Sequence, residues 1–168
     1  MKHSLTRLIP FLFLAMNLAL MNCSSDSNPM IDLDDPSTLA GNYKLVSVTD
    51  KTGEEYGQAG LTITAGEPTI ITVQEQGISV TMTLTITGTL TLTETTYTFS
   101  ETVTFAISGF PETTETEADN GTYTISGSTM TLVSDDETEA PETGTISVSG
   151  SQLTIDFADD FTVVFEKQ

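Results

Sequence analysis

The residues that carry most enzyme chemistry are almost absent from this chain of 168 residues. His3 is the single histidine and Cys23 the single cysteine, and residues 24–168 also lack arginine and tryptophan. Serine–histidine and cysteine–histidine nucleophiles therefore cannot form in that part of the chain. Zinc or iron sites built on histidine and cysteine are excluded there for the same reason. A disulfide bond within the chain is impossible with one cysteine.

Carboxylates are the reactive groups that remain, and all 24 lie beyond Cys23. Two of them could run a glycosidase, but no motif selects a pair, so we expect a non-catalytic protein without a cofactor. Calcium is the one metal that the acids could bind, at residues 32–35, 134–139 or 158–160. None of these segments has the ligand spacing of a dedicated calcium loop. We therefore expect solvated acidic loops and no metal site.

The first 23 residues have the organisation of a targeting segment. Lys2 and Arg7 precede an apolar stretch, residues 8–21, which is too short to span a membrane comfortably. The stretch ends in LMNC at residues 20–23, and the segment resembles a bacterial lipoprotein signal peptide with its lipobox. That resemblance implies that residues 1–22 are removed and that Cys23 carries a diacyl or triacyl anchor. An ordinary secretory signal followed by a chance cysteine is the alternative.

The same resemblance implies a lipoprotein of the cell envelope, and Ser24 is compatible with sorting to the outer membrane. From Ser24 onward three lysines oppose 24 acids, a formal charge of −21. Such a chain repels nucleic acid and anionic lipid, so we expect no nucleic-acid partner and membrane contact through the anchor. Residues 23–38 carry the anchor and are polar and acidic, which predicts a flexible tether. The folded domain is expected at residues 39–168.

Strict alternation of apolar and hydroxyl side chains marks the segment that starts at Ile78. Up to Leu92 the even positions are apolar except Gly88, and the odd positions 79–93 are serine or threonine. A period of two predicts a β-strand, and Gly88 is the natural place for a bend, with a turn there as the alternative. Threonine favours strands and supplies 32 residues, and no segment has a sustained helical period. We predict nine or so strands and no helix beyond one turn.

Matching of apolar positions predicts which strands pair. A loop at residues 93–96 would set Leu92 opposite Tyr97 and Gly88 opposite Glu101. In the last third, two similar strand–turn–strand units have two-residue turns, Gly-Ser, at residues 127–128 and 150–151. The last five strands then form an up-and-down meander. This order favours an all-β, antiparallel up-and-down barrel over an immunoglobulin-like sandwich, which is the alternative.

The apolar face of such a barrel points either into its core or into lipid. A lipid anchor is unnecessary for a protein that already spans the membrane. The aromatic residues are scattered in depth and do not form two girdles, and the chain lacks a terminal aromatic residue. We therefore expect the apolar side chains inside and the threonines facing water, with a membrane barrel as the alternative.

Two segments, LAGNYKLVSV at residues 39–48 and GTYTISGSTMTL at residues 121–132, resemble the lipocalin-like domains of bacterial lipoproteins. Gly41 and Tyr43 stand where lipocalins have Gly-x-Trp on the first barrel strand, with tyrosine in place of tryptophan. The resemblance implies a lipocalin-like barrel with a central cavity for a small apolar ligand. It also implies that a basic residue near the last strand, here Lys167, packs over the aromatic ring of Tyr43.

Inward-facing side chains are the candidate ligand site. Glu101 would lie among apolar side chains, where a lone carboxylate stays protonated or finds a partner and could orient a ligand through a hydrogen bond. A bulge that turns Glu101 outward is the alternative. The aromatic residues that could line a cavity with it are Tyr43, Tyr97, Phe99, Phe105 and Tyr123.

Simple filling of the core is the alternative for these aromatic residues, because an eight-stranded barrel can be packed solid or can hold one small ligand. Two functions therefore remain. One is non-catalytic binding of a small hydrophobic ligand. The other is a surface interaction or structural module with a filled core, whose acidic, threonine-rich exterior contacts a protein or a glycan.

Overall fold

The structure is a computed structural model that describes residues 33, 35–54, 56–75, 78–158 and 160–168. The predicted signal peptide, Cys23 and most of the predicted tether lie outside the described residues, as do parts of two candidate calcium segments. No helix in the described ranges is long and apolar enough to cross a membrane.

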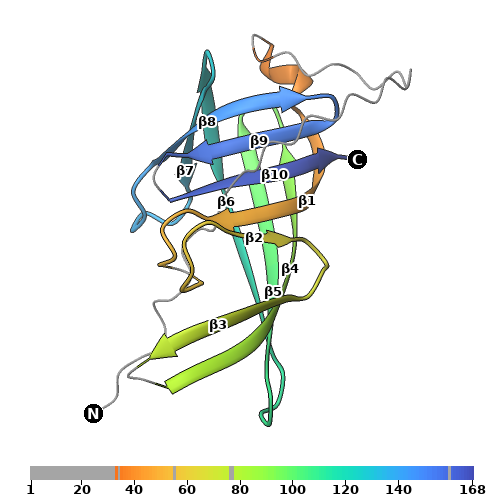
Figure 1. The fold of residues 1–168 in the computed structure, drawn as a ribbon. Coiled ribbons are helices and arrows are strands. Elements are labelled where there is room, and N and C mark those ends of the chain that lie inside the picture. The colour runs from red at the N-terminus through yellow and green to blue at the C-terminus, as the bar shows by residue number, and fades with distance from the viewer. Residues whose placement is uncertain (1–32, 34, 55, 76–77, 159) are drawn as a thin grey trace.

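Antiparallel strands make up almost the whole fold (Figure 1). Their order in the sheet is β2-β1-β10-β9-β8-β7-β6-β5-β4-β3, and a further pairing between β1 and β4 closes it. Strands β1 and β4 to β10 therefore form a closed eight-stranded barrel, which confirms the all-β barrel prediction and rules out the sandwich. The elements are η1 (Pro36–Thr38), β1 (Gly41–Asp50), β2 (Leu61–Thr64), β3 (Thr69–Glu75), β4 (Ile78–Leu92), β5 (Thr96–Ile107), β6 (Thr113–Ser126), β7 (Thr129–Ser134), β8 (Glu142–Ser149), β9 (Gln152–Phe157) and β10 (Phe161–Lys167).

The predicted pairing of the strands is confirmed. Leu92 pairs with Tyr97, and Gly88 pairs with Glu101, across β4 and β5. The two Gly-Ser turns join β6 to β7 and β8 to β9 in the expected register, and β10 follows as the last strand of the meander. β4 is one unbroken strand, so the alternative with a turn at Gly88 is wrong. A slip of one residue would move the apolar set to the other face, which is why the pattern determines the register.

The apolar side chains line the inside of the barrel and the threonines its outside. On β4 the buried residues are Leu84, Ile86, Leu90 and Leu92, whereas the threonines at positions 87, 89 and 91 are exposed. The alternative with an apolar outer face is therefore wrong. On the outside, threonines of neighbouring strands hydrogen-bond through their hydroxyl groups, for example across β5 and β6 at 3.1 Å.

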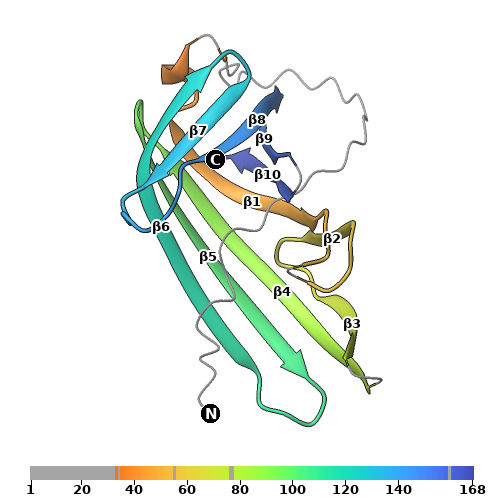
Figure 2. The ribbon, with the colours of Figure 1, turned by 90° about the vertical axis from the view of Figure 1, so that its left-hand side faces the viewer.

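β4 is long because it pairs with two different strands in succession. Its first half pairs with β3, and residues 89–92 pair with β1. β1 in turn leaves β4 after Lys44 and pairs with β2 from Ser47 onward, and its register with β10 shifts at the same point. Where β1 has left β4, four strands extend away from the barrel as an arm (Figure 2). The arm consists of β3 and of the paired parts of β4, β5 and β6, residues 78–86, 100–107 and 113–120.

Lys167 closes the end of the barrel where β1 begins. Its ammonium group lies 5.7 Å from the centre of the Tyr43 ring and donates a hydrogen bond to the carbonyl oxygen of Thr38 at 2.8 Å. A cation over an aromatic face is attracted by the negative face of the ring. Gly41, at φ +152°, leaves room for this side chain, since a Cβ there would lie 2.8 Å from the Cε atom of Lys167. The contact that the lipocalin resemblance implied is thus confirmed.

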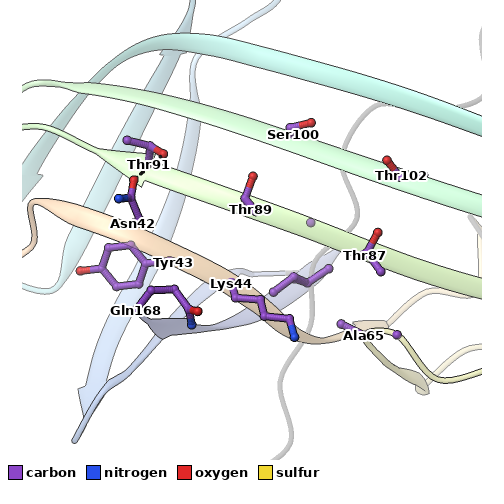
Figure 3. A pocket seen from close by; sticks show the side chains of 13 residues that line it. Asn42, Tyr43, Lys44, Ala65, Thr87, Thr89, Thr91, Ser100, Thr102 and Gln168 are labelled. Carbon is purple, nitrogen blue, oxygen red and sulfur yellow. Dashed lines mark hydrogen bonds between the residues drawn. The ribbon is translucent and has the colours of Figure 1, made fainter.

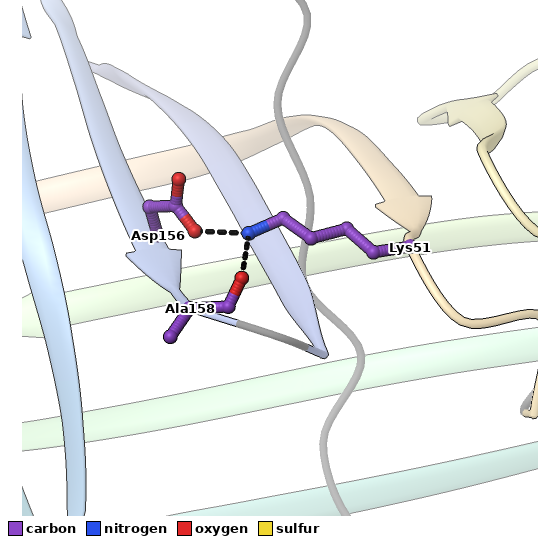
Figure 4. Close-up of polar contacts among 3 residues, drawn as sticks. All are labelled: Lys51, Asp156 and Ala158. Atoms are coloured by element: carbon purple, nitrogen blue, oxygen red, sulfur yellow. Dashed lines mark hydrogen bonds and ion pairs between the residues drawn. The ribbon is translucent and has the colours of Figure 1, made fainter.

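Charged residues hold the other end of β1. Lys51 forms an ion pair with Asp156 of β9 and donates a hydrogen bond to the carbonyl oxygen of Ala158 at 2.7 Å (Figure 4). Asp50 is fully buried. Its carboxylate accepts hydrogen bonds of 2.6–3.0 Å from three backbone N–H groups of the next loop, those of Thr52, Gly53 and Tyr56. The loop after β1 is therefore anchored to the barrel through β1 and β9.

Candidate functional site

The barrel interior is packed where two of the predicted ligand residues meet. Tyr97 and Phe99 border an apolar cavity of about 20 Å³ that is enclosed by side chains of β4, β5, β7, β9 and β10. The ring of Phe99 meets that of Phe165 edge to face, with 6.2 Å between the ring centres. A cavity of this size has room for about one water molecule, whereas pockets for small ligands occupy roughly 300–1,000 Å³. Side chains fill this part of the barrel.

The other predicted aromatic residues are also engaged in the core. The hydroxyl of Tyr43 donates to the carbonyl oxygen of Leu39 at 2.6 Å, and that of Tyr123 donates to Thr93 at 2.7 Å. Burial raises the pKa of Tyr43 to about 12 and also raises that of Tyr123, so both remain protonated donors. Phe105 packs half-buried against the core. These contacts match the core-filling alternative, and a ligand for the aromatic residues stays a prediction.

Glu101 is buried in the barrel wall, with 6% of its surface exposed. It lies opposite Gly88 on β4 and opposite Glu117 on β6, in a register without interruption. The predicted inward position is therefore correct and the bulge alternative is wrong. Glu101 borders a pocket of about 140 Å³, here called the acidic pocket, which is lined by Phe99, Glu101, Glu117, Ala118, Asp119, Ser134, Asp136 and Glu139.

Asp119 connects the acidic pocket to the barrel core. It accepts hydrogen bonds from the Tyr97 hydroxyl at 2.5 Å and from the Ser134 hydroxyl at 2.7 Å. Burial, together with this carboxylate, raises the pKa of Tyr97 well above its ordinary value. The predicted residue Tyr97 thus links the barrel core to the pocket.

Carboxylates crowd one another around the acidic pocket. Partial burial raises the pKa of Glu117, and the charges of Glu115 and Glu139 raise it further. Burial followed by repulsion from Glu139, Asp119 and other acids raises the pKa of Glu142 to about 7. Like charges held close together favour uptake of a proton or the approach of a cation. No three acidic, histidine or cysteine side chains converge to hold a metal ion in the part of the chain that the structure describes.

A larger depression lies outside the barrel, where β1 separates from β4. It has a volume of about 540 Å³, within the range of small-ligand pockets. We call it the outer groove (Figure 3). Its lining consists of Asn42, Tyr43, Lys44, Leu45, Ala65, Gly66, Thr87, Gly88, Thr89, Thr91, Ser100, Thr102 and Gln168.

The outer groove lies where β1 leaves β4 after Lys44 and pairs with β2. Gly88 is closely packed, since a Cβ there would lie 3.1 Å from the carbonyl oxygen of Ser100 and 3.4 Å from Leu45. Gly66, at φ +78°, follows β2 in a turn that its backbone conformation permits. Its N–H donates to the carbonyl oxygen of Ile86 at 2.7 Å. This bond ties the turn to β4 and bounds one end of the groove.

Hydroxyl and amide side chains supply most of the polar groups of the outer groove, and apolar atoms make up the larger share of its exposed lining. Threonines 87, 89 and 91 of β4 stand in a row beside Ser100 and Thr102 of β5 (Figure 3). The hydroxyl of Thr91 donates to the side-chain oxygen of Asn42 at 3.1 Å. Lys44 is exposed and has no acidic partner among the described residues. Such a surface offers many hydrogen-bond donors and acceptors and one positive charge.

The predicted site residues and the outer groove overlap only at Tyr43. The groove was missed because it joins β1, β4, β5 and the turn after β2, which no local pattern connects. Its one visible signal was the row of threonines on the outer face of β4, which we expected only to face water.

Comparison of the chain with models of protein families, with curated proteins and with solved structures gives no match. The fold itself defines the class: a closed eight-stranded antiparallel β-barrel. The lipocalin-like resemblance stays a prediction.

Proposed function

We propose that this chain is a non-catalytic recognition module that binds a polyhydroxylated ligand, such as a short neutral glycan, in the outer groove. The observation that carries this proposal is the contrast between two volumes. The apolar cavity beside Tyr97 and Phe99 measures about 20 Å³, and the hydroxyl-lined groove outside measures about 540 Å³.

The polar groups of the groove suit a hydroxyl-rich ligand better than an anionic one. Threonine and serine hydroxyls both donate and accept hydrogen bonds, as do the amides of Asn42 and Gln168 taken together. Sugar hydroxyls need this mixture. An anionic ligand would be attracted by Lys44 alone and repelled by the net negative charge of the rest of the chain.

Titration of the purified protein with maltotriose, cellotriose and chitotriose, followed by NMR, tests the proposal. We expect one of these sugars to shift amide signals of β4 and β5 around the groove. Thr89→Val keeps the shape of the side chain and removes its hydroxyl, and we expect about fivefold weaker binding, since one hydrogen bond contributes about 1 kcal/mol. Thr124→Val, an equivalent exposed change on β6, is the matched control. Equal loss in both variants, or no shift with any sugar, would contradict the proposal.

Binding of a small hydrophobic ligand inside the barrel is the rival outcome. An environment-sensitive apolar fluorophore that binds saturably and is displaced by fatty acids would support it. The same protein sample serves both titrations, so the two functions are separated directly.

The module is further proposed to be a lipoprotein of the cell envelope, anchored in the outer membrane through Cys23. The support comes from the amino-acid sequence: Lys2 and Arg7, the apolar stretch at residues 8–21, and the single cysteine that follows it. Metabolic labelling with an alkyne analogue of palmitate tests this in cells. Label on the wild-type chain and none on Cys23→Ala is expected, and equal labelling of both would refute the anchor.

A further inference from the structure

One edge of β6 lacks a neighbouring strand over part of its length. β6 pairs with β5 over residues 113–122 but with β7 only over residues 121–126. Between positions 113 and 119 no strand of the described chain covers the other edge. Figure 2 shows β6 as the outermost strand of the arm on this side. The side chains of residues 113–118 are all exposed.

The alternation of hydrogen bonds shows which backbone groups this edge offers. The N–H of Tyr123 donates to Thr95 beside β5, so odd-numbered residues of β6 bond towards β5. The carbonyl oxygen of Asn120 accepts from Asp135 on the opposite side, as expected for an even-numbered residue. The N–H and C=O groups of Thr114, Thr116 and Ala118 therefore point to the uncovered edge. An exposed row of this kind is a template for an added strand.

Negative charge accompanies the free edge. Glu115, Glu117 and Asp119 lie on one face of β6, because alternate residues of a strand share a face. Two of them line the acidic pocket, which adjoins the end of β7 through Ser134 and Asp136. A strand added to β6 would continue the line of β7 and would have one side chain next to this pocket.

We propose that the free edge of β6 binds an extended segment of another protein that carries lysine or arginine at alternate positions. Two cations would lie opposite Glu115 and Glu117, and the second would enter the acidic pocket. Backbone hydrogen bonds to Thr114, Thr116 and Ala118 hold the added strand, as in other complexes formed by β-strand addition. Partial burial and then repulsion from Glu115 and Glu139 raise the pKa of Glu117, and a cation relieves the repulsion.

A second copy of this chain does not fit the edge. Pairing of β6 with itself would bring rows of glutamates together, and like charges in facing positions destabilise a sheet. The chain contains five lysines and arginines, and no two of them are separated by one residue. The acids thus prevent association of copies, which is a common use of charge on edge strands, and they leave the edge open to a cationic partner.

Amide hydrogen exchange tests the proposal on the purified protein. The probe is a blocked seven-residue peptide that alternates threonine and lysine. We expect at least tenfold slower exchange of the amides of Thr114, Thr116 and Ala118 at saturating peptide. The amides of Glu115 and Glu117 bond towards β5 and serve as an internal control, because they should change little.

Two altered peptides separate strand addition from attraction between opposite net charges. Methylation of the threonine backbone nitrogens keeps every lysine but blocks hydrogen bonds to β6, so the slowing of exchange should vanish. Replacement of each lysine by glutamate should abolish binding. If the methylated peptide binds as tightly as the unmodified lysine peptide, or if the unmodified lysine peptide does not protect the three amides, the proposal is overturned.

Variants of the protein provide an independent measurement. Glu117→Gln should weaken binding of the lysine peptide about threefold, in line with an exposed ion pair. Glu54→Gln removes the same charge from an exposed loop and should leave the affinity unchanged. An equal effect of both variants would mean that only the net charge of the protein attracts the peptide, and this too would overturn the proposal.

Discussion

Replacement of Glu142 by glutamine should make the stability of the barrel less dependent on pH. Glu142 begins β8 opposite Leu132. Burial, together with repulsion from Glu139, Asp119 and Asp160, raises its pKa from 4.5 to about 7. The folded barrel therefore prefers the protonated carboxyl group, and glutamine imitates that form without a charge.

The sign and size of the effect follow from the two pKa values. Between pH 4.5 and pH 7 the folded state binds more protons than the unfolded state, so the free energy of unfolding falls as the pH rises. The full difference between the two pKa values corresponds to about 3 kcal/mol in the free energy of unfolding. Because the carboxyl group is partly exposed, solvent screening reduces this to about 1.5 kcal/mol.

Urea unfolding at pH 5 and pH 8 measures the effect. At pH 8 we expect Glu142→Gln to be about 1.5 kcal/mol more stable than the wild type, which is a rise of about 1 M in the urea midpoint. At pH 5 the two should nearly coincide. Glu54→Gln removes a charge from an exposed loop and should follow the wild type at both pH values. A gain for Glu142→Gln that is equal at both pH values would refute the reasoning.

Three further substitutions test separate contacts by urea unfolding. Asp50→Ala leaves three backbone N–H groups of the next loop without their acceptor and should cost about 3 kcal/mol; a loss below 1 kcal/mol would contradict that role. Gly121→Ala would set a Cβ 2.0 Å from a backbone carbonyl oxygen of β7 and should lower the free energy of unfolding by at least about 2 kcal/mol. Its control, Gly127→Ala, meets open space and should lower it by only about 1 kcal/mol because of the positive φ at that position. Lys167→Met removes the cation over an aromatic ring and one hydrogen bond, with an expected loss of about 1–2 kcal/mol; unchanged stability would show that the contact contributes nothing.

Local pairing could be predicted from the sequence because hairpins place facing residues close together along the chain. The strict alternation around Gly88 determined its pairing with Glu101, and hence the buried position of that carboxylate. The two Gly-Ser turns determined the hairpins of the last third in the same way. In each case a shift of one residue would have exposed the whole apolar set.

Contacts between distant segments could not be predicted in this way. The change of partner of β1, from β4 to β2, leaves no mark in a period-two pattern, so the outer groove was not foreseen. The free edge of β6 was not foreseen either, because the pattern does not show that β7 pairs with β6 only over residues 121–126. The acidic segment at residues 134–139 was expected to be solvated, and residues 135–139 are exposed. Asp136 and Glu139 also line the acidic pocket beside Glu101 and Glu117, which was not foreseen, because the meander returns the end of β7 to β6.

The pairing of β1 with β4 and β10 also determines when the barrel can close during folding. Strands β4 to β9 each pair with the next strand in the chain, whereas β1 needs both β4 and β10, and β10 is the last strand of the barrel to be synthesised. Contacts between such distant segments form slowly, because closing the long loop costs chain entropy before the contacts can stabilise the fold. We therefore expect β1 to complete its pairing only after β10 has been synthesised. A chain cut short before Phe161 should keep its hairpins but leave the barrel open, with β1 missing its longest pairing.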